Sequence, residues 1–178
     1  NSNASNNRFL SLAEELVKQG FNILVLILHT YSDISERKKY SQKGKINGIN
    51  YEYIFPIFIP NYRISKYLNL FWYSFFLSEY RLIRKINSTG YRIVWLHFGP
   101  SVIKSGIILM DKLKSKLFFH EQSEYSWIGI SPKLQTIYLN EFLPKLNLVA
   151  VMTKKLLDYY KKYVNTNCAI LHLPMTVD

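Results

Sequence analysis

The segment Leu117-Phe118-Phe119-His120-Glu121-Gln122-Ser123-Glu124-Tyr125 decides the fold class, because an apolar strand passes there directly into polar side chains. A second apolar run, 148–151, reaches Thr153 in a similar way. Polar groups at the carboxyl end of a buried strand are typical of α/β proteins, since the strand fixes the backbone while the loop frees the side chains. The segment therefore predicts a parallel sheet with a ligand site along its carboxyl edge.

Strand-like and helix-like patterns alternate along the rest of the chain. Gly20 is the expected stop of the first helix, and the lysine-rich segment 29–48 has little periodicity and predicts a loop. This alternation, with right-handed crossovers, predicts a mostly parallel, doubly wound, Rossmann-like sheet. The predicted strands are 23–28, 49–55, 93–96, 117–119, 148–151 and 169–171, and the predicted helices are 9–17, 65–87, 102–113, 133–143 and 154–163.

The order of elements at the start of the chain is unusual for this fold. The chain opens on a helix, whereas such domains normally open on a strand with a Gly-rich turn, so we expect one domain over 1–178 whose first strand is absent. Neither G-x-G-x-x-G nor G-x-x-x-x-G-K-[ST] occurs, so no segment is expected to hold a nucleotide pyrophosphate. Ser2-Asn3-Ala4 resembles the remainder of an expression tag.

The charge of the chain favours a polyanionic partner. Its 23 Lys and Arg against 12 Asp and Glu leave a formal charge of +11, which suits nucleic acid, anionic lipid headgroups or phosphate-bearing substrates. The basic residues are scattered and no RNP, helix-turn-helix or zinc pattern appears, so we expect no nucleic acid.

Two further features bear on the compartment. The single cysteine, Cys168, excludes an intramolecular disulfide and favours a reducing compartment, and no apolar run reaches the 18 residues of a membrane span. These features predict a cytoplasmic protein, with a peripheral position at the inner face of the cytoplasmic membrane as a further expectation.

The predicted helix 65–87 is rich in aromatic residues and has basic residues at both ends. Such a stretch can lie in a membrane interface with its rings at headgroup level, or it can pack as a core helix on a sheet. Both interpretations stay open at this point. The aromatic residues are Phe71, Trp72, Tyr73, Phe75, Phe76 and Tyr80.

An ordered set of segments resembles the GT-B glycosyltransferases of family 4. Segment 12–26 is similar to the family pattern LAxxLxxxGHxVxVLT, Val149-Ala150-Val151-Met152-Thr153 stands in place of IIAVS, and Leu173-Pro174-Met175-Thr176-Val177-Asp178 stands in place of IPNGVD. Trp95-Leu96-His97-Phe98 and the strand end at Phe119-His120 also fit. The chain departs from the family at Phe21, at Met175-Thr176 and in lacking the Gly-Gly donor-phosphate loop.

The resemblance implies a function for the whole protein. This chain would be the N-terminal, acceptor-binding domain, and a C-terminal domain outside it would bind a nucleotide-diphosphate sugar through an E-x7-E pattern. The reaction would transfer the sugar, with retention of anomeric configuration, to a lipid-linked or cell-surface glycan in bacterial capsule, lipopolysaccharide or other polysaccharide synthesis. No metal or other cofactor is expected, and an anionic membrane surface is a further expected partner. The alternative is a noncatalytic GT-B-like binding module or a membrane-docking subunit.

Two histidines are the main candidates for the site. His97 and His120 end predicted strands separated by one crossover, so we expect them to be neighbours at the carboxyl edge. An imidazole there can accept a proton from a sugar hydroxyl or hydrogen-bond a sugar.

We expect His120 and Glu124 to be catalytic, with Glu124 orienting His120 or an acceptor hydroxyl. His97, His29 and Glu121 are expected to bind acceptor or donor, His29 because the family often places a substrate-facing loop after that strand. The spacing of these residues shows no metal-ligand set. Each of them has a plainer alternative as a structural or solvated residue.

Overall fold

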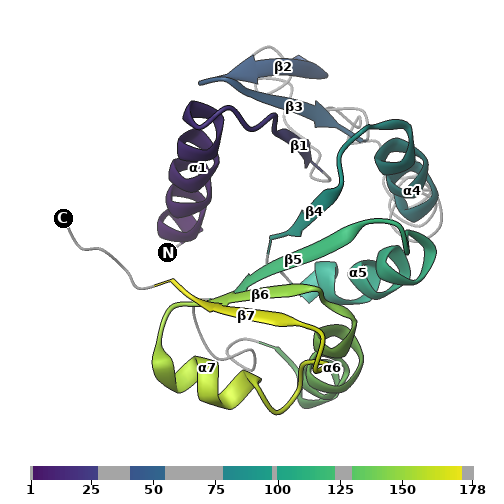
Figure 1. Ribbon diagram of the computed structural model, residues 1–178. Coiled ribbons are helices and arrows are strands. Elements are labelled where there is room, and N and C mark those ends of the chain that lie inside the picture. The colour runs from purple at the N-terminus through teal and green to yellow at the C-terminus, as the bar shows by residue number, and fades with distance from the viewer. Residues whose placement is uncertain (1, 28–40, 55–77, 98–99, 123–129, 174–178) are drawn as a thin grey trace. The chain divides into compact units, whose positions relative to one another are not determined.

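The computed structural model describes residues 2–27, 41–54, 78–97, 100–122 and 130–173. The chain divides into two compact units, Asn1–Leu82 and Ile83–Asp178, which we describe separately (Figure 1). Helix α4 (Ser78–Ser88) crosses the division. Among the described residues, no helix is both long and apolar enough to cross a membrane.

The first unit joins one long helix to a three-stranded sheet. Helix α1 (Ser2–Lys18) is followed by β1 (Leu24–Ile27), β2 (Lys43–Ile46) and β3 (Ile49–Tyr53), and the strand order is β1-β3-β2. The helix ends as the sequence predicts: Gly20 has φ +90°, its amide donates to the Val17 carbonyl, and the Phe21 amide donates to the Leu16 carbonyl. This pair of bonds is the Schellman motif, which glycine closes without strain.

One prediction in this unit is wrong. Segment 29–48 is predicted as a loop, but β2 lies within it and pairs antiparallel with β3, with Ile46 opposite Ile49. Asn47 and Gly48 have φ of 50° and 85°, as a two-residue hairpin turn of the Asn-Gly type requires. The Asn-Gly dipeptide is itself a sequence signal for a hairpin. The lysines near it favour a loop, which is why the short strand is not predicted. The rest of the segment, 28–40, lies outside the described residues.

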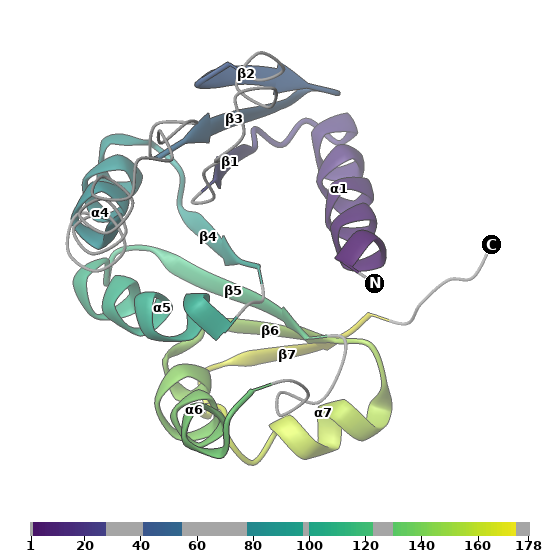
Figure 2. The ribbon, with the colours of Figure 1, turned by 180° about the vertical axis from the view of Figure 1, so that it is seen from behind.

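The second unit is a four-stranded, all-parallel sheet with helices between its strands (Figure 2). Its elements are β4 (Ile93–Leu96), α5 (Pro100–Lys112), β5 (Leu117–Gln122), α6 (Pro132–Ile137), a π-helical turn (Tyr138–Phe142), a 3-10 turn (Leu143–Lys145), β6 (Leu148–Val151), α7 (Lys154–Tyr160) and β7 (Ala169–His172). The protein is therefore α/β and compatible with a Rossmann-like fold. The strands of this sheet follow in chain order, β4-β5-β6-β7. A doubly wound sheet has a point at which the strand order reverses, and this sheet alone does not contain one.

Local sequence sets where the later helices begin. The Leu134 amide donates to the Ser131 hydroxyl at 3.3 Å, which caps α6, and Pro132 follows in the first turn. The Leu156 amide donates to Thr153 Oγ1 at 3.2 Å, which caps α7 directly after β6. Thr153, expected at a strand end, is therefore placed there and serves the following helix.

The predicted aromatic helix 65–87 is described only from its last part. Helix α4 begins at Ser78, and Tyr80 near its start is 63% exposed, while Leu82 and Ile86 are buried. The other five aromatic residues of the cluster lie outside the described residues.

The core of the second unit lies between the sheet and the π-helical turn. Strand β5 alternates, with Phe118, His120 and Gln122 buried and the residues between them more exposed. Phe142 of the π-helical turn is 1% exposed, and a Cβ added to Gly106 of α5 would lie 2.7 Å from its ring and 3.2 Å from Leu96. Glycine is thus needed at 106 for the helix to approach so closely.

Replacement of Gly106 by alanine is expected to destabilise the protein by about 1–2 kcal/mol, because overpacking against a fixed ring exceeds the gain in helix propensity. The measurement is urea unfolding followed by circular dichroism. Gly90→Ala is the control, since nothing lies within 4 Å of a Cβ added there. An unchanged midpoint for Gly106→Ala would show that the ring can move aside.

Candidate functional site

The carboxyl edge of the β4–β7 sheet gathers the described candidate residues. In the parallel register Leu96 lies opposite His120, and Gln122 lies opposite Val151. His97 directly follows β4, and Glu121 lies near the end of β5. The prediction that β4 and β5 are parallel neighbours is therefore confirmed.

His97 and Glu121 are the accessible pair at this edge. Both are half-buried. Burial lowers the pKa of His97, and the charge of Glu121 opposes that shift, so the two side chains interact electrostatically. The imidazole is therefore neutral at neutral pH and lies near a carboxylate. A neutral ring paired with an anion can accept a hydrogen bond from a hydroxyl and can take its proton.

His120 does not end its strand, which corrects the sequence-based expectation. Strand β5 continues to Gln122, and the alternation of the strand places His120 on the same buried face as Phe118 and Gln122. The ring is 1% exposed. The prediction was based on the change from apolar to polar residues after Phe119, but burial continues through the polar residues of the strand.

Both ring nitrogens of His120 have protein partners. Nδ1 donates to the Leu96 carbonyl at 2.8 Å, and Nε2 lies 3.1 Å from the Gln122 carboxamide oxygen, Oε1. Burial is the largest cause that lowers the pKa of His120. The ring also meets Phe142 edge-on, with the centroids 5.3 Å apart.

The Gln122 carboxamide joins His120 to Tyr138. Its Oε1 lies 3.1 Å from Nε2 of His120. The Tyr138 hydroxyl donates to the same Oε1 at 3.2 Å and completes the buried network.

Tyr138 links this network to the rest of the core. Burial raises the pKa of Tyr138 well above its ordinary value, with smaller contributions from Tyr160, so its hydroxyl stays protonated. Its ring stacks on Phe142, with the centroids 5.3 Å apart and the planes 20° from parallel. Residues Tyr138 and Phe142 begin and end the π-helical turn, so that turn presents both rings to His120.

Of the other histidines and acidic residues considered from the sequence, the structure describes only some. His29 and Glu124 lie outside the described residues. His172 is half-buried, and its Nε2 donates to the Met152 carbonyl at 3.2 Å. In the part of the chain that the structure describes, no three His, Cys, Asp or Glu side chains gather as a metal ion would need.

Sequence reasoning missed Gln122 and Tyr138. Gln122 is buried like an apolar residue and has two polar partners, although it stands between Glu121 and Ser123 in a polar segment. The available signal was its spacing of two residues from His120, which places both side chains on one face of a strand.

Folding stability is expected to fall as the pH drops below about 6.5, the ordinary histidine value. The folded-state pKa values of His120 and His97 are both lowered, so the unfolded chain binds these protons more readily than the folded chain. Their stabilising contribution is complete above the unfolded value and is lost as the pH falls toward the folded values. Urea midpoints between pH 8 and pH 5.5 measure this loss.

His120→Gln should weaken the dependence of the midpoint on pH, because it removes the buried imidazole whose pKa is lowered. A wild-type midpoint that stays constant or rises on acidification would contradict the buried, neutral assignment of His120.

Tyr138→Phe is expected to cost about 1–2 kcal/mol of unfolding free energy, because it removes one hydrogen-bond partner of the buried Gln122 amide. Equilibrium urea unfolding gives the value. Tyr80→Phe is the matched control on an exposed tyrosine and should leave stability unchanged. Equal effects of the two substitutions would show that the Gln122 contact does not contribute.

No family profile matches the sequence, and no curated protein matches it either. The likeness to the GT-B glycosyltransferases therefore stays a hypothesis, whereas the α/β architecture with an all-parallel sheet is shown by the structure itself.

Proposed function

We propose that this chain is the acceptor-binding part of a retaining glycosyltransferase with a GT-B, doubly wound architecture. The observation that carries the proposal is the pair formed by His97 and Glu121 at the carboxyl edge of an all-parallel sheet. Ligands of α/β proteins bind at that edge, and a neutral imidazole beside a carboxylate suits a sugar hydroxyl. The order of the sequence motifs supports the same assignment.

Within this proposal the two histidines have different roles. His97, with Glu121, contacts the acceptor hydroxyl and orients it toward the donor sugar. His120 is a positioning residue, because its Nδ1 holds the carbonyl of Leu96, the residue before His97. The proposal still assigns Glu124 and His29 to the substrate-facing segments that follow β5 and β1 in the sequence.

The partners follow from the same proposal. A nucleotide-diphosphate sugar binds to a second, donor-binding domain, and the acceptor is a lipid-linked or cell-surface glycan of bacterial polysaccharide synthesis. Closure of the two domains over the acceptor excludes water and completes the site. The reaction needs no metal, and the protein acts in the cytoplasm or at the inner face of the cytoplasmic membrane.

The direct test uses a protein that contains this chain together with its donor-binding domain. UDP-glucose, UDP-galactose, UDP-N-acetylglucosamine and GDP-mannose are each offered with an undecaprenyl diphosphate-linked sugar. Acceptor-dependent release of UDP or GDP, with a product that keeps the donor's anomeric configuration, is the expected result. An inverted product contradicts the retaining assignment, and glycan binding without any release favours the noncatalytic binding module.

His97→Gln is expected to lower kcat/KM for transfer by about 100-fold, as the loss of a general acid-base group typically does. His172→Gln is the matched control at another strand end, because that ring is held by the Met152 carbonyl. Circular dichroism confirms that both variants fold. Transfer at the wild-type kcat/KM by His97→Gln would remove this residue from the site.

A further inference from the structure

The two faces of the β4–β7 sheet differ in their packing. Burial alternates along β5, so His120 lies on the buried face and Phe119 lies on the more exposed one. Phe142 of the π-helical turn meets the His120 ring, and Gly106 of α5 lies close to Leu96. Since Leu96 is the register partner of His120, the turn and α5 both pack on the buried face. The face that carries Phe119 is therefore the one to search for a further ligand contact.

Two aromatic rings lie side by side on this more exposed face. Trp95 of β4 is the register partner of Phe119 of β5, and their ring centroids are 5.1 Å apart with the planes 43° from parallel. Both side chains are half-buried, so part of each remains accessible. The face of an aromatic ring carries partial negative charge, which attracts the C–H groups of a ligand. We call Trp95 and Phe119 the aromatic pair.

The aromatic pair leads directly into the polar pair at the carboxyl edge. His97 follows Trp95 by two residues and Glu121 follows Phe119 by two, so the alternation of the strands places all four on one face. Burial lowers the pKa of His97 and the charge of Glu121 opposes this shift, so these two side chains are also near each other. Two residues along a strand span about 7 Å, which is comparable with one sugar ring and its hydroxyls.

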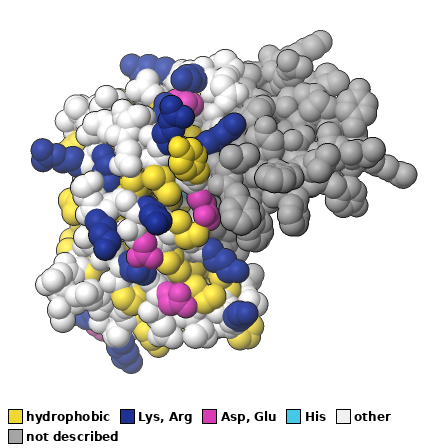
Figure 3. All heavy atoms as spheres, turned by 90° about the vertical axis from the view of Figure 1, so that its right-hand side faces the viewer, with side chains coloured by type: hydrophobic (Ala, Val, Ile, Leu, Met, Phe, Trp, Pro, Cys, Tyr) yellow, Lys and Arg dark blue, Asp and Glu magenta, His cyan; other side chains and the backbone are white. Residues whose placement is uncertain are grey.

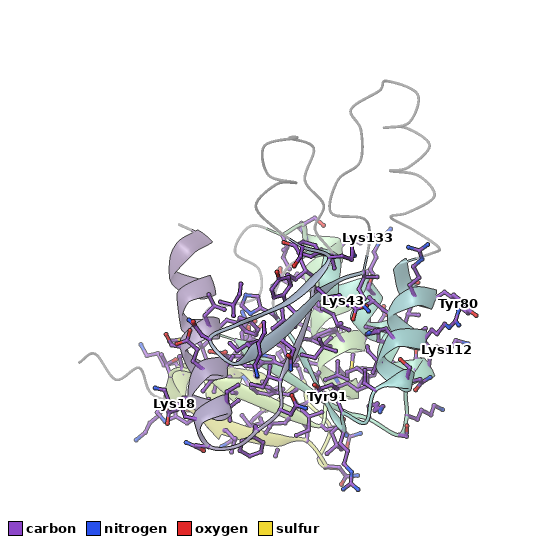
Figure 4. All side chains as sticks on the ribbon, turned by 90° about the horizontal axis from the view of Figure 1, so that it is seen from above. Lys18, Lys43, Tyr80, Tyr91, Lys112 and Lys133 are labelled. Carbon is purple, nitrogen blue, oxygen red and sulfur yellow. The ribbon has the colours of Figure 1, made fainter. Side chains whose placement is uncertain are left out.

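Exposure of an apolar side chain is not enough to define a binding site. Tyr80 is 63% exposed and extends outward from α4 (Figure 4), and hydrophobic side chains on the side shown in Figure 3 lie among charged ones. Single exposed apolar side chains are normal on a protein surface. The aromatic pair differs because its two rings pack together and share a sheet face with His97 and Glu121.

The chemistry of these four side chains distinguishes among possible ligands. An isoprenoid chain offers no hydrogen bonds to the half-buried Glu121 carboxylate that it would cover, so that contact costs free energy. A nucleic acid or a uronic acid would bring a second negative charge to the same carboxylate. A neutral pyranose avoids both costs, because one face of its ring carries C–H groups and its edge carries hydroxyls.

We propose that the aromatic pair is a stacking subsite for a neutral pyranose of the acceptor, whose hydroxyl groups reach His97 and Glu121. The C–H face of the sugar lies on the rings of Trp95 and Phe119, and the polar pair fixes the orientation in which a hydroxyl meets His97. This inference rests on the proposed function and adds the kind of sugar that binds next to the reacting hydroxyl. Sugar binding can be measured without transfer, so the two can fail separately.

The first experiment is saturation-transfer-difference NMR on the intact chain with methyl glycosides at millimolar concentration. Methyl β-D-glucoside, methyl β-D-galactoside and methyl α-D-mannoside are the neutral probes, and methyl β-D-glucuronide is the charged one. We expect saturation of the C–H protons on one ring face of a neutral probe, and about fivefold weaker binding of the glucuronide. Absence of saturation in all the neutral probes, or equal binding of the glucuronide, overturns the proposal.

Variants then test the side chains themselves. Phe119→Leu is expected to weaken binding of the neutral probe about fivefold, whereas Phe119→Tyr, which keeps the ring, should leave it unchanged. Phe21→Leu is the matched control, on a phenylalanine of the first unit that is 58% exposed. Glu121→Gln should abolish the discrimination against the glucuronide, because it removes the carboxylate charge. Circular dichroism checks the fold of each variant, and wild-type binding by Phe119→Leu would remove this ring from the subsite.

A transfer assay and a lipid probe separate the remaining outcomes. In the protein that includes the donor-binding domain, Phe119→Leu should raise KM for the acceptor about fivefold and leave kcat unchanged. An unchanged KM would overturn the subsite and leave the proposed function standing. Sugar binding that depends on Phe119, without any transfer, would support the subsite and contradict the proposed function. Saturation of the methyl protons of geranyl diphosphate, with none in the glycosides, would assign this face to a lipid instead.

Discussion

The hydrogen bond from His120 Nδ1 to the Leu96 carbonyl holds together the edge on which the proposed site depends. It joins β4 to β5 through a side chain at the point where β4 ends, and His97 is the next residue. A ring that is 1% exposed cannot exchange this partner for water, so breaking the bond would leave a buried donor unpaired. His120 thus fixes the backbone of Leu96, the residue directly before the accessible His97.

The core around this bond is aromatic. Nε2 of His120 and the Tyr138 hydroxyl both lie against Oε1 of Gln122. Tyr138 and Phe142 both face the ring, because residues four apart lie on one face of a helical turn. Gly106 then allows α5 to approach Phe142 closely. These side chains therefore pack around the buried imidazole.

The sequence predicted the elements of this fold far better than their ends. Apolar runs at 93–96 and 148–151 and the helix stop at Gly20 agree with the structure, because burial and glycine geometry are local properties. The sequence did not predict strand β2, because its lysines do not form the pattern of a buried strand. The dipeptide Asn47-Gly48 is nevertheless typical of the hairpin turn that follows it.

The candidate site was predictable in its location but not in its division of roles. Parallel strands bring His97 and Glu121 to one edge, as their positions after apolar runs imply. Whether His120 faces that edge or the core depends on how far β5 continues. The residues after Phe119 are polar, so the sequence does not indicate that the strand stays buried there. The partners Gln122 and Tyr138 are 16 residues apart, so their contact follows from tertiary packing alone.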